Sequence, residues 1–130
     1  MKSVFLLLGA ICAFMGVGLG AFGAHALKAT ITPEALAIYH TGVTYQMWHS
    51  LGLIGIGLLE HQIPGSKLAP WAGWLMFSGI LLFSGSLYLL ALLNLHWIGM
   101  ITPVGGVCFL IAWLLVCLSV KNKKPKKRYN

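Results

Sequence analysis

The sequence predicts an all-α, membrane-embedded bundle of four transmembrane helices that forms a single domain. Of the 130 residues, 58% are hydrophobic and only 8% are charged, whereas soluble domains carry about 25% charged residues. A soluble fold of this size could not bury so much apolar surface, which makes lipid the expected solvent. Apolar segments at residues 3–24, 41–60, 72–93 and 103–120 are each long enough to cross the hydrocarbon core as a helix.

The first apolar segment places its small residues on one helical face. They recur at steps of four, three, four and three, a spacing that lets a second helix approach closely. A cleaved signal peptide has a shorter apolar run, of about 7–15 residues, and needs no such face. We therefore expect this segment to be retained as the first span and to pack through Gly9, Ala13, Gly16, Gly20 and Gly23.

The second span follows a predicted helix start at Thr32 and Pro33, with threonine as N-cap and proline at the first helical position. We expect a short outward-facing helix near 33–40, either separate or continuous with the span. Within the span, Tyr45 and His49 lie on one face, and Gln46 begins a neighbouring face. His49 falls close to the bilayer midplane if the helix is straight.

The third and fourth spans carry a polar patch and further glycines. Residues 83–88, Phe-Ser-Gly-Ser-Leu-Tyr, place Ser84, Ser86 and Tyr88 around Gly85 in a helix otherwise rich in leucine. Thr102 precedes a proline and predicts the start of the fourth span. Gly85, Gly105 and Gly106 are expected to allow close helix packing.

The distribution of lysine and arginine predicts that both termini face the cytoplasm. Four spans place the termini on one side, and eight of the nine basic residues lie on that side, with only Lys28 on the other. Residues 121–130 form a basic cytoplasmic tail, for which anionic lipid head groups are the expected partner and nucleic acid is not. The eight basic residues are Lys2, Lys67, Lys121, Lys123, Lys124, Lys126, Lys127 and Arg128.

This orientation brings polar residues of all four spans into the outer half of the bundle. Because polar groups facing lipid are costly, they should face one another or a water-filled pocket. The favoured interpretation is a hydrogen-bonded core that fixes helix register; the alternative is a small-molecule or proton site with a titrating histidine. The candidate polar pocket consists of His25, Tyr45, Gln46, His49, Ser84, Ser86, Tyr88 and Thr102.

No catalytic residue, metal site or cofactor is expected. The chain has no Gly-x-Ser-x-Gly motif and no acidic pair for acid–base work. His25, His40 and His96 share the predicted outer side but lack the close helical spacing of metal ligands. A transporter would also lack an intramembrane carboxylate for cation coupling, because the only acidic residues are Glu34 and Glu60.

Four motifs stand out along the chain: Gly20-Ala21-Phe22-Gly23-Ala24-His25, Tyr45-Gln46 with His49, Phe83-Ser84-Gly85-Ser86-Leu87-Tyr88, and Thr102-Pro103-Val104-Gly105-Gly106. Together they resemble an uncharacterised family of small four-span bacterial inner-membrane proteins that includes YgdD and YwdK. The resemblance covers about residues 4–120 and implies a multi-pass protein of the bacterial inner membrane, without bringing an activity. We therefore expect a non-enzymatic structural or accessory protein, with a homo-oligomer or another membrane protein as candidate partner; the alternative is a small transporter or a ligand- or proton-binding protein.

Overall fold

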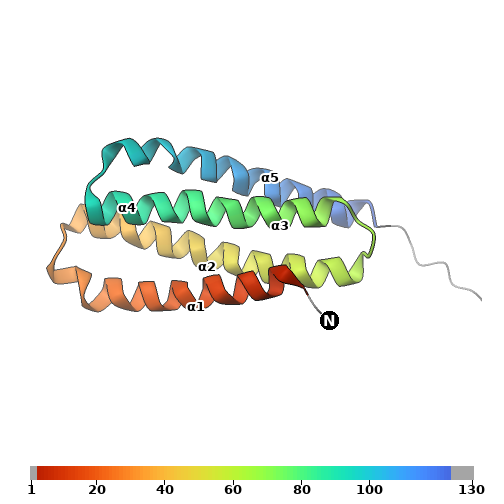
Figure 1. The fold of residues 1–130 in the computed structure, drawn as a ribbon, viewed down its shortest axis with the longest axis horizontal. Coiled ribbons are helices and arrows are strands. Elements are labelled where there is room, and N and C mark those ends of the chain that lie inside the picture. Colours follow the sequence, from red (N-terminus) through yellow and green to blue (C-terminus); the bar gives the residue numbers. More distant parts are fainter. Residues whose placement is uncertain (1–2, 124–130) are drawn as a thin grey trace, which may run out of the picture.

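The computed structural model describes residues 3–123, which form helices and connecting turns without any strand (Figure 1). The all-helical prediction is thereby confirmed. Short 3₁₀ turns, η1 (Leu27–Ala29) and η3 (His96–Met100), connect the longer elements at one end. The helices are α1 (Val4–His25), α2 (Pro33–Gln62), α3 (Leu68–Gly79), α4 (Gly85–Leu93) and α5 (Thr102–Lys121), and a π-helical turn η2 (Ile80–Ser84) joins α3 and α4 into one continuous rod.

The helices form two antiparallel hairpins that lie side by side (Figure 1). α1 packs along α2, and α5 packs along α3 and η2; α2 also packs against α3, η2 and α4, which joins the hairpins. The turns after α1 and α4 lie at one end of the bundle. The start of α1, the turn between α2 and α3 and the end of α5 lie at the other end, so both ends of the described chain share one side.

α2 is one uninterrupted helix of 30 residues, so of the two alternatives for the segment near 33–40 the structure has the one that is continuous with the second span. The predicted start is present, because the Thr32 hydroxyl accepts a hydrogen bond from the Ala35 amide at 3.2 Å and Pro33 occupies the first turn. No proline follows to break the helix. Tyr39 is buried against α1 and donates its hydroxyl to the carbonyl of Leu19, which holds this part of α2 on the bundle.

Large apolar side chains cover the outside of the bundle, and several polar side chains are buried inside it beside an apolar core. Three helical stretches are long and apolar enough to cross a membrane, namely Val4–Ala29, Leu68–Leu93 and His96–Lys121. Large side chains such as Phe14 and Leu110 are exposed, whereas Ser50 and Ser84 are fully buried. A surface with so many large apolar side chains is unusual for a soluble protein, and it matches a lipid surrounding in which polar groups must find partners inside the protein.

Glycines bring α1 and α2 into backbone contact. A Cβ atom on Gly9 would lie 2.8 Å from the carbonyl oxygen of Ser50 and 2.9 Å from the amide nitrogen of Ile54. On the same face of α1, the side chains of Met47, Val43 and Tyr39 occupy the space beside Gly16, Gly20 and Gly23 respectively, and Ala13 is half-buried. This face of α1 is therefore covered by α2 within the chain and does not offer a surface for self-association.

In the second hairpin, the glycines of the third and fourth spans differ from one another. Gly105 packs directly on the backbone of Phe83, so a Cβ atom there would overlap main-chain atoms. Gly106 has only an ordinary contact, at 3.8 Å from the Phe83 ring, and Gly85 has open space where a Cβ would stand. Of these three glycines, only Gly105 is required for the close packing of α5 on η2.

We predict that Gly9→Ala destabilises the protein by about 1–3 kcal/mol, because the added methyl group would overlap backbone atoms of α2 that cannot rotate away. Gly18→Ala is the matched control: it lies in the same helix, and nothing stands within 4 Å of its Cβ position. It should leave the stability unchanged or raise it by up to about 1 kcal/mol, because alanine favours the helix over glycine. Unfolding of the purified protein by SDS in mixed micelles, followed by circular dichroism, measures both; equal effects would contradict the assigned contact.

Candidate functional site

A chain of side-chain hydrogen bonds crosses three helices at Gln46. The Tyr88 hydroxyl of α4 donates to Oε1 of Gln46 at 2.6 Å. Nε2 of Gln46 in turn donates to the Cys12 carbonyl of α1 at 2.8 Å. Only 4% of Gln46 is exposed, so its amide is used inside the protein to connect α1, α2 and α4.

Serine hydroxyls connect the remaining helices. Ser84 in η2 donates to the Gly42 carbonyl of α2 at 2.7 Å. Ser86 donates to the Phe83 carbonyl at 2.8 Å and lies 2.6 Å from the Thr102 hydroxyl of α5. Because a serine hydroxyl has one proton and the carbonyl can only accept, Thr102 is the donor to Ser86.

Tyr45 and His49 face α5 instead of this network. The His49 ring stacks on Phe109 with centroids 3.6 Å apart and an interplanar angle of 15°. The Tyr45 ring lies 4.5 Å from that of Phe83. Nδ1 of His49 is 2.7 Å from the Tyr45 carbonyl oxygen, which has no proton to give. Nδ1 therefore carries the proton, and the neutral ring presents Nε2 as a hydrogen-bond acceptor.

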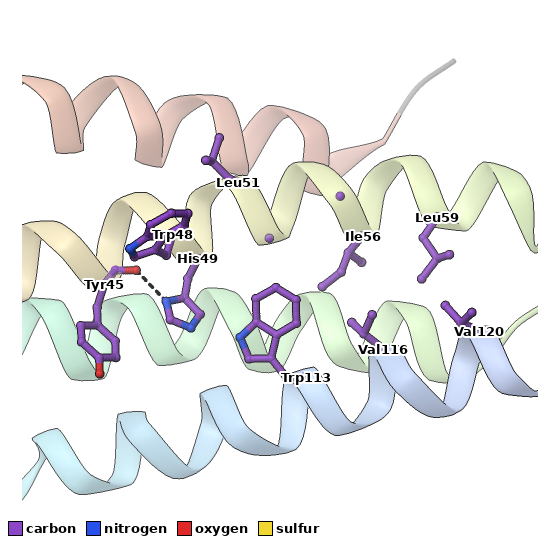
Figure 2. A pocket seen from close by; sticks show the side chains of 11 residues that line it. Tyr45, Trp48, His49, Leu51, Ile56, Leu59, Trp113, Val116 and Val120 are labelled. Carbon is purple, nitrogen blue, oxygen red and sulfur yellow. Dashed lines mark hydrogen bonds between the residues drawn. The ribbon is translucent and has the colours of Figure 1, made fainter.

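A groove of about 730 Å³ opens beside His49, between α2 and α5 (Figure 2). Aromatic side chains line one end of the groove, and aliphatic side chains and two glycines line the rest. Sequence reasoning did not find this groove, because it could not show which faces of α2 and α5 remain apart. The groove is lined by Tyr45, Trp48, His49, Trp113 at the aromatic end and Leu51, Gly52, Gly55, Ile56, Leu59, Val116 and Val120 beyond it.

A second hollow, of about 1190 Å³, lies at the end of the bundle where α1 begins and α5 ends. The turn from His61 to Leu68 forms one side, and the end of α5 with Ser119 and Lys123 forms the other. Lys67 and Lys123 both line it.

Lys121 lies at the end of α5, whereas the remaining tail residues of the sequence prediction fall outside residues 3–123.

The eight residues predicted as one polar pocket are divided by the structure into three groups. Five of them are joined by hydrogen bonds between helices: Gln46, Ser84, Ser86, Tyr88 and Thr102. Tyr45 and His49 line the groove on another face of α2. His25 is exposed at the end of α1, and its side chain makes no hydrogen bond with any described residue.

Sequence reasoning also missed Tyr39 and Gly42. They lie seven and four residues before Gln46, on the same face of α2, so helical spacing alone could have added them. Phe109 could not be found in this way, because it belongs to α5. Within residues 3–123, no group of three histidine, cysteine, aspartate or glutamate side chains is placed to hold a metal ion.

We predict that Tyr88→Phe destabilises the protein by about 0.6 kcal/mol, the mean measured for interhelical hydrogen bonds in a membrane protein, and by no more than the measured maximum of about 1.7 kcal/mol. In a Gln46→Leu background the same change should cost close to zero, because its acceptor is already gone. Tyr45→Phe is the control, since the Tyr45 hydroxyl makes no hydrogen bond with a described residue. SDS unfolding of the four-member cycle measures the coupling, and additive losses would contradict a direct bond.

Comparisons with known proteins agree with the membrane character of this fold. A family model described as "Protein of unknown function (DUF423)" matches residues 19–106. The UPF0382 membrane protein YwdK of Bacillus subtilis is 49% identical over 116 residues, 89% of this chain and 94% of that protein. A UPF0382 membrane protein of Staphylococcus saprophyticus is 48% identical over 115 residues, 88% of this chain and 94% of its own.

None of these printed names includes an enzymatic activity, and no solved structure matches the chain. The family model covers more than half of the chain, and the Bacillus relative is aligned over nearly its whole length. The chain therefore belongs to the DUF423 family, which agrees with the resemblance seen in its motifs.

Proposed function

We propose that this chain is a multi-pass protein of the bacterial inner membrane whose four helices all span the bilayer, with both termini in the cytoplasm. Three helical stretches have the length and apolar character of spans. α2 is more polar, but it packs against α1 on one side and α3, η2 and α4 on another, and these neighbours supply partners for its polar groups. Lys67 lies at the end that the excess of basic residues assigns to the cytoplasm.

The role that the geometry supports best is structural or accessory rather than enzymatic. One observation carries this proposal: within residues 3–123, every fully buried side-chain nitrogen or oxygen has a hydrogen-bond partner. The partners are mostly backbone carbonyls. Tyr39, Gln46 and Ser84 donate to carbonyls of neighbouring helices and so fix helix positions. Ser50, Ser86 and Ser119 donate to carbonyls of their own rod. A catalytic or transport site would instead keep polar groups available to a substrate.

Anionic lipid head groups are the proposed partner at the cytoplasmic end. The hollow beside the end of α5 carries Lys67 and Lys123 and has Ser119 in its lining. The nearby Glu60 accepts a hydrogen bond from Ser3 at 3.3 Å. A lysine near an anionic membrane surface contributes about 1 kcal/mol of attraction. Lys67 and Lys123 therefore add to the attraction between the basic tail and anionic lipid.

A labelling experiment tests this proposal against a water-filled pocket. In a cysteine-free background, Lys28→Cys should react with a membrane-impermeant maleimide in intact cells, and Lys67→Cys only after lysis. Ser84→Cys should resist small thiol reagents from both sides, because Ser84 is fully buried in the network.

Two results would count against it. Labelling of Lys67→Cys in intact cells would contradict the orientation. Rapid labelling of Ser84→Cys in folded protein would show that solvent enters the bundle, as a transporter requires. Retention of native helix content in each variant, measured by circular dichroism, is the control for folding.

A further inference from the structure

His49 holds a polar atom toward the membrane side of the bundle without a partner. Only 7% of this residue is exposed, yet Nε2 makes no hydrogen bond with any described residue. Every fully buried side-chain nitrogen or oxygen in residues 3–123 has a hydrogen-bond partner. Because Nε2 has none, this atom must be partly accessible. In Figure 2 the ring extends from α2 into the groove between α2 and α5. Nε2 therefore offers an acceptor to whatever occupies the groove.

Aromatic rings surround that acceptor. Phe109 stacks on the His49 ring, and the Trp113 ring centroid lies 6.0 Å away at an angle of 59°. The indole nitrogen of Trp113 is drawn on the side toward His49 (Figure 2). An indole N–H can only donate, whereas Nε2 can only accept in the neutral ring. A hydroxyl group satisfies both, because it donates one hydrogen bond and accepts another.

The remainder of the groove suits an apolar tail. From His49 to Leu59 it follows ten residues of α2, about 15 Å, past Gly55 and Ile56 on one side and Val116 on the other. No atom lies within 4 Å of the position that a Cβ atom would take at Gly55, so the groove is open there. Its sides reach the surface of the bundle that faces lipid.

The depth of His49 distinguishes among lipids, given the four-span arrangement proposed above. An ordinary phospholipid keeps its polar head at the interface and would place only the methyl end of an acyl chain against Nε2. A molecule that carries its hydroxyl on a ring can bring that hydroxyl into the hydrocarbon core, because the ring and tail are apolar. The aromatic end of the groove also offers flat surfaces for such a ring.

We propose that the groove between α2 and α5 binds a membrane-soluble molecule with a hydroxylated aromatic ring and an apolar tail, whose hydroxyl donates to Nε2 of His49. The ring lies among Tyr45, Trp48 and Trp113, and the tail follows Gly55 toward Val120. This binding adds to the structural role, since the hydrogen bonds of Gln46 and Ser84 are on other faces and stay intact.

The test uses the full chain in nanodiscs of phosphatidylcholine, with para-dodecylphenol as probe. The methyl ether of the same compound is the matched probe, because it has the ring and tail but no proton to donate. Tryptophan fluorescence titrations measure affinity, and nitrogen NMR of histidine-labelled protein reports on Nε2. We expect the phenol to bind about 5-fold tighter than the ether, as one hydrogen bond provides, and to shift the Nε2 resonance.

Three variants locate the site. His49→Phe retains a ring that can stack on Phe109, and should reduce phenol affinity to that of the ether. In Gly55→Leu the leucine side chain fills the groove, so this variant should bind neither probe. Gly18→Leu is the control for a leucine added at an open helical glycine, and should change neither affinity, because Gly18 is in α1 and does not line the groove.

The proposal is overturned if wild-type protein binds phenol and ether equally, or if folded Gly55→Leu still binds the phenol. It is also overturned if Gly55→Leu changes a dimer to a monomer while the wild type shows no preference for the phenol, since a second copy then fills the groove. If His49→Phe does not fold, the phenol-to-ether ratio and the Gly55→Leu result still decide.

Discussion

The side-chain amide of Gln46 connects three helices, and the arrangement of the bundle depends on this connection. Its carbonyl accepts from Tyr88 of α4, and its nitrogen donates to the Cys12 carbonyl of α1. In lipid the hydrophobic effect does not drive helices together, so close packing and hydrogen bonds between helices must do so. α2 is central because it carries this amide and contacts both neighbouring rods.

Close approach and hydrogen bonding depend on each other along α2. At Gly42, a Cβ atom would lie 2.8 Å from the Tyr88 ring, and the carbonyl of the same residue accepts from Ser84. Absence of a side chain there lets α4 come near enough for Tyr88 to reach Gln46. A larger residue at Gly42 would therefore disturb two hydrogen bonds as well as the packing. Glycine in a membrane helix costs some intrinsic helix stability, which the contacts it permits offset.

Periodicity and hydropathy could predict the helices, because both depend on short-range sequence patterns. They could also place Tyr45, Gln46 and His49 at one depth of α2. They could not show that Gln46 faces α1 and α4 while His49 faces α5, since that depends on the rotation of α2 among its neighbours. The π-helical turn at Ile80–Ser84 adds to the difficulty. It shifts the residues that follow by about 100° relative to an uninterrupted α-helix, and the sequence contains no clear signal for it.

Some polar residues form hydrogen bonds between helices, and others line the groove; this difference determines where the protein can bind a ligand. Inside the bundle, the hydroxyls of Ser84, Ser86 and Tyr88 are already bonded to protein groups, and a ligand there would have to displace them. Among residues 3–123, Nε2 of His49 has no such competitor, because the ring is bonded to the Tyr45 carbonyl through Nδ1 alone. An acceptor that faces the hydrocarbon region stays desolvated unless a donor reaches it, so a donor dissolved in the membrane gains a hydrogen bond that lipid chains do not offer. The groove beside His49 is thus the place where binding costs the fewest protein contacts.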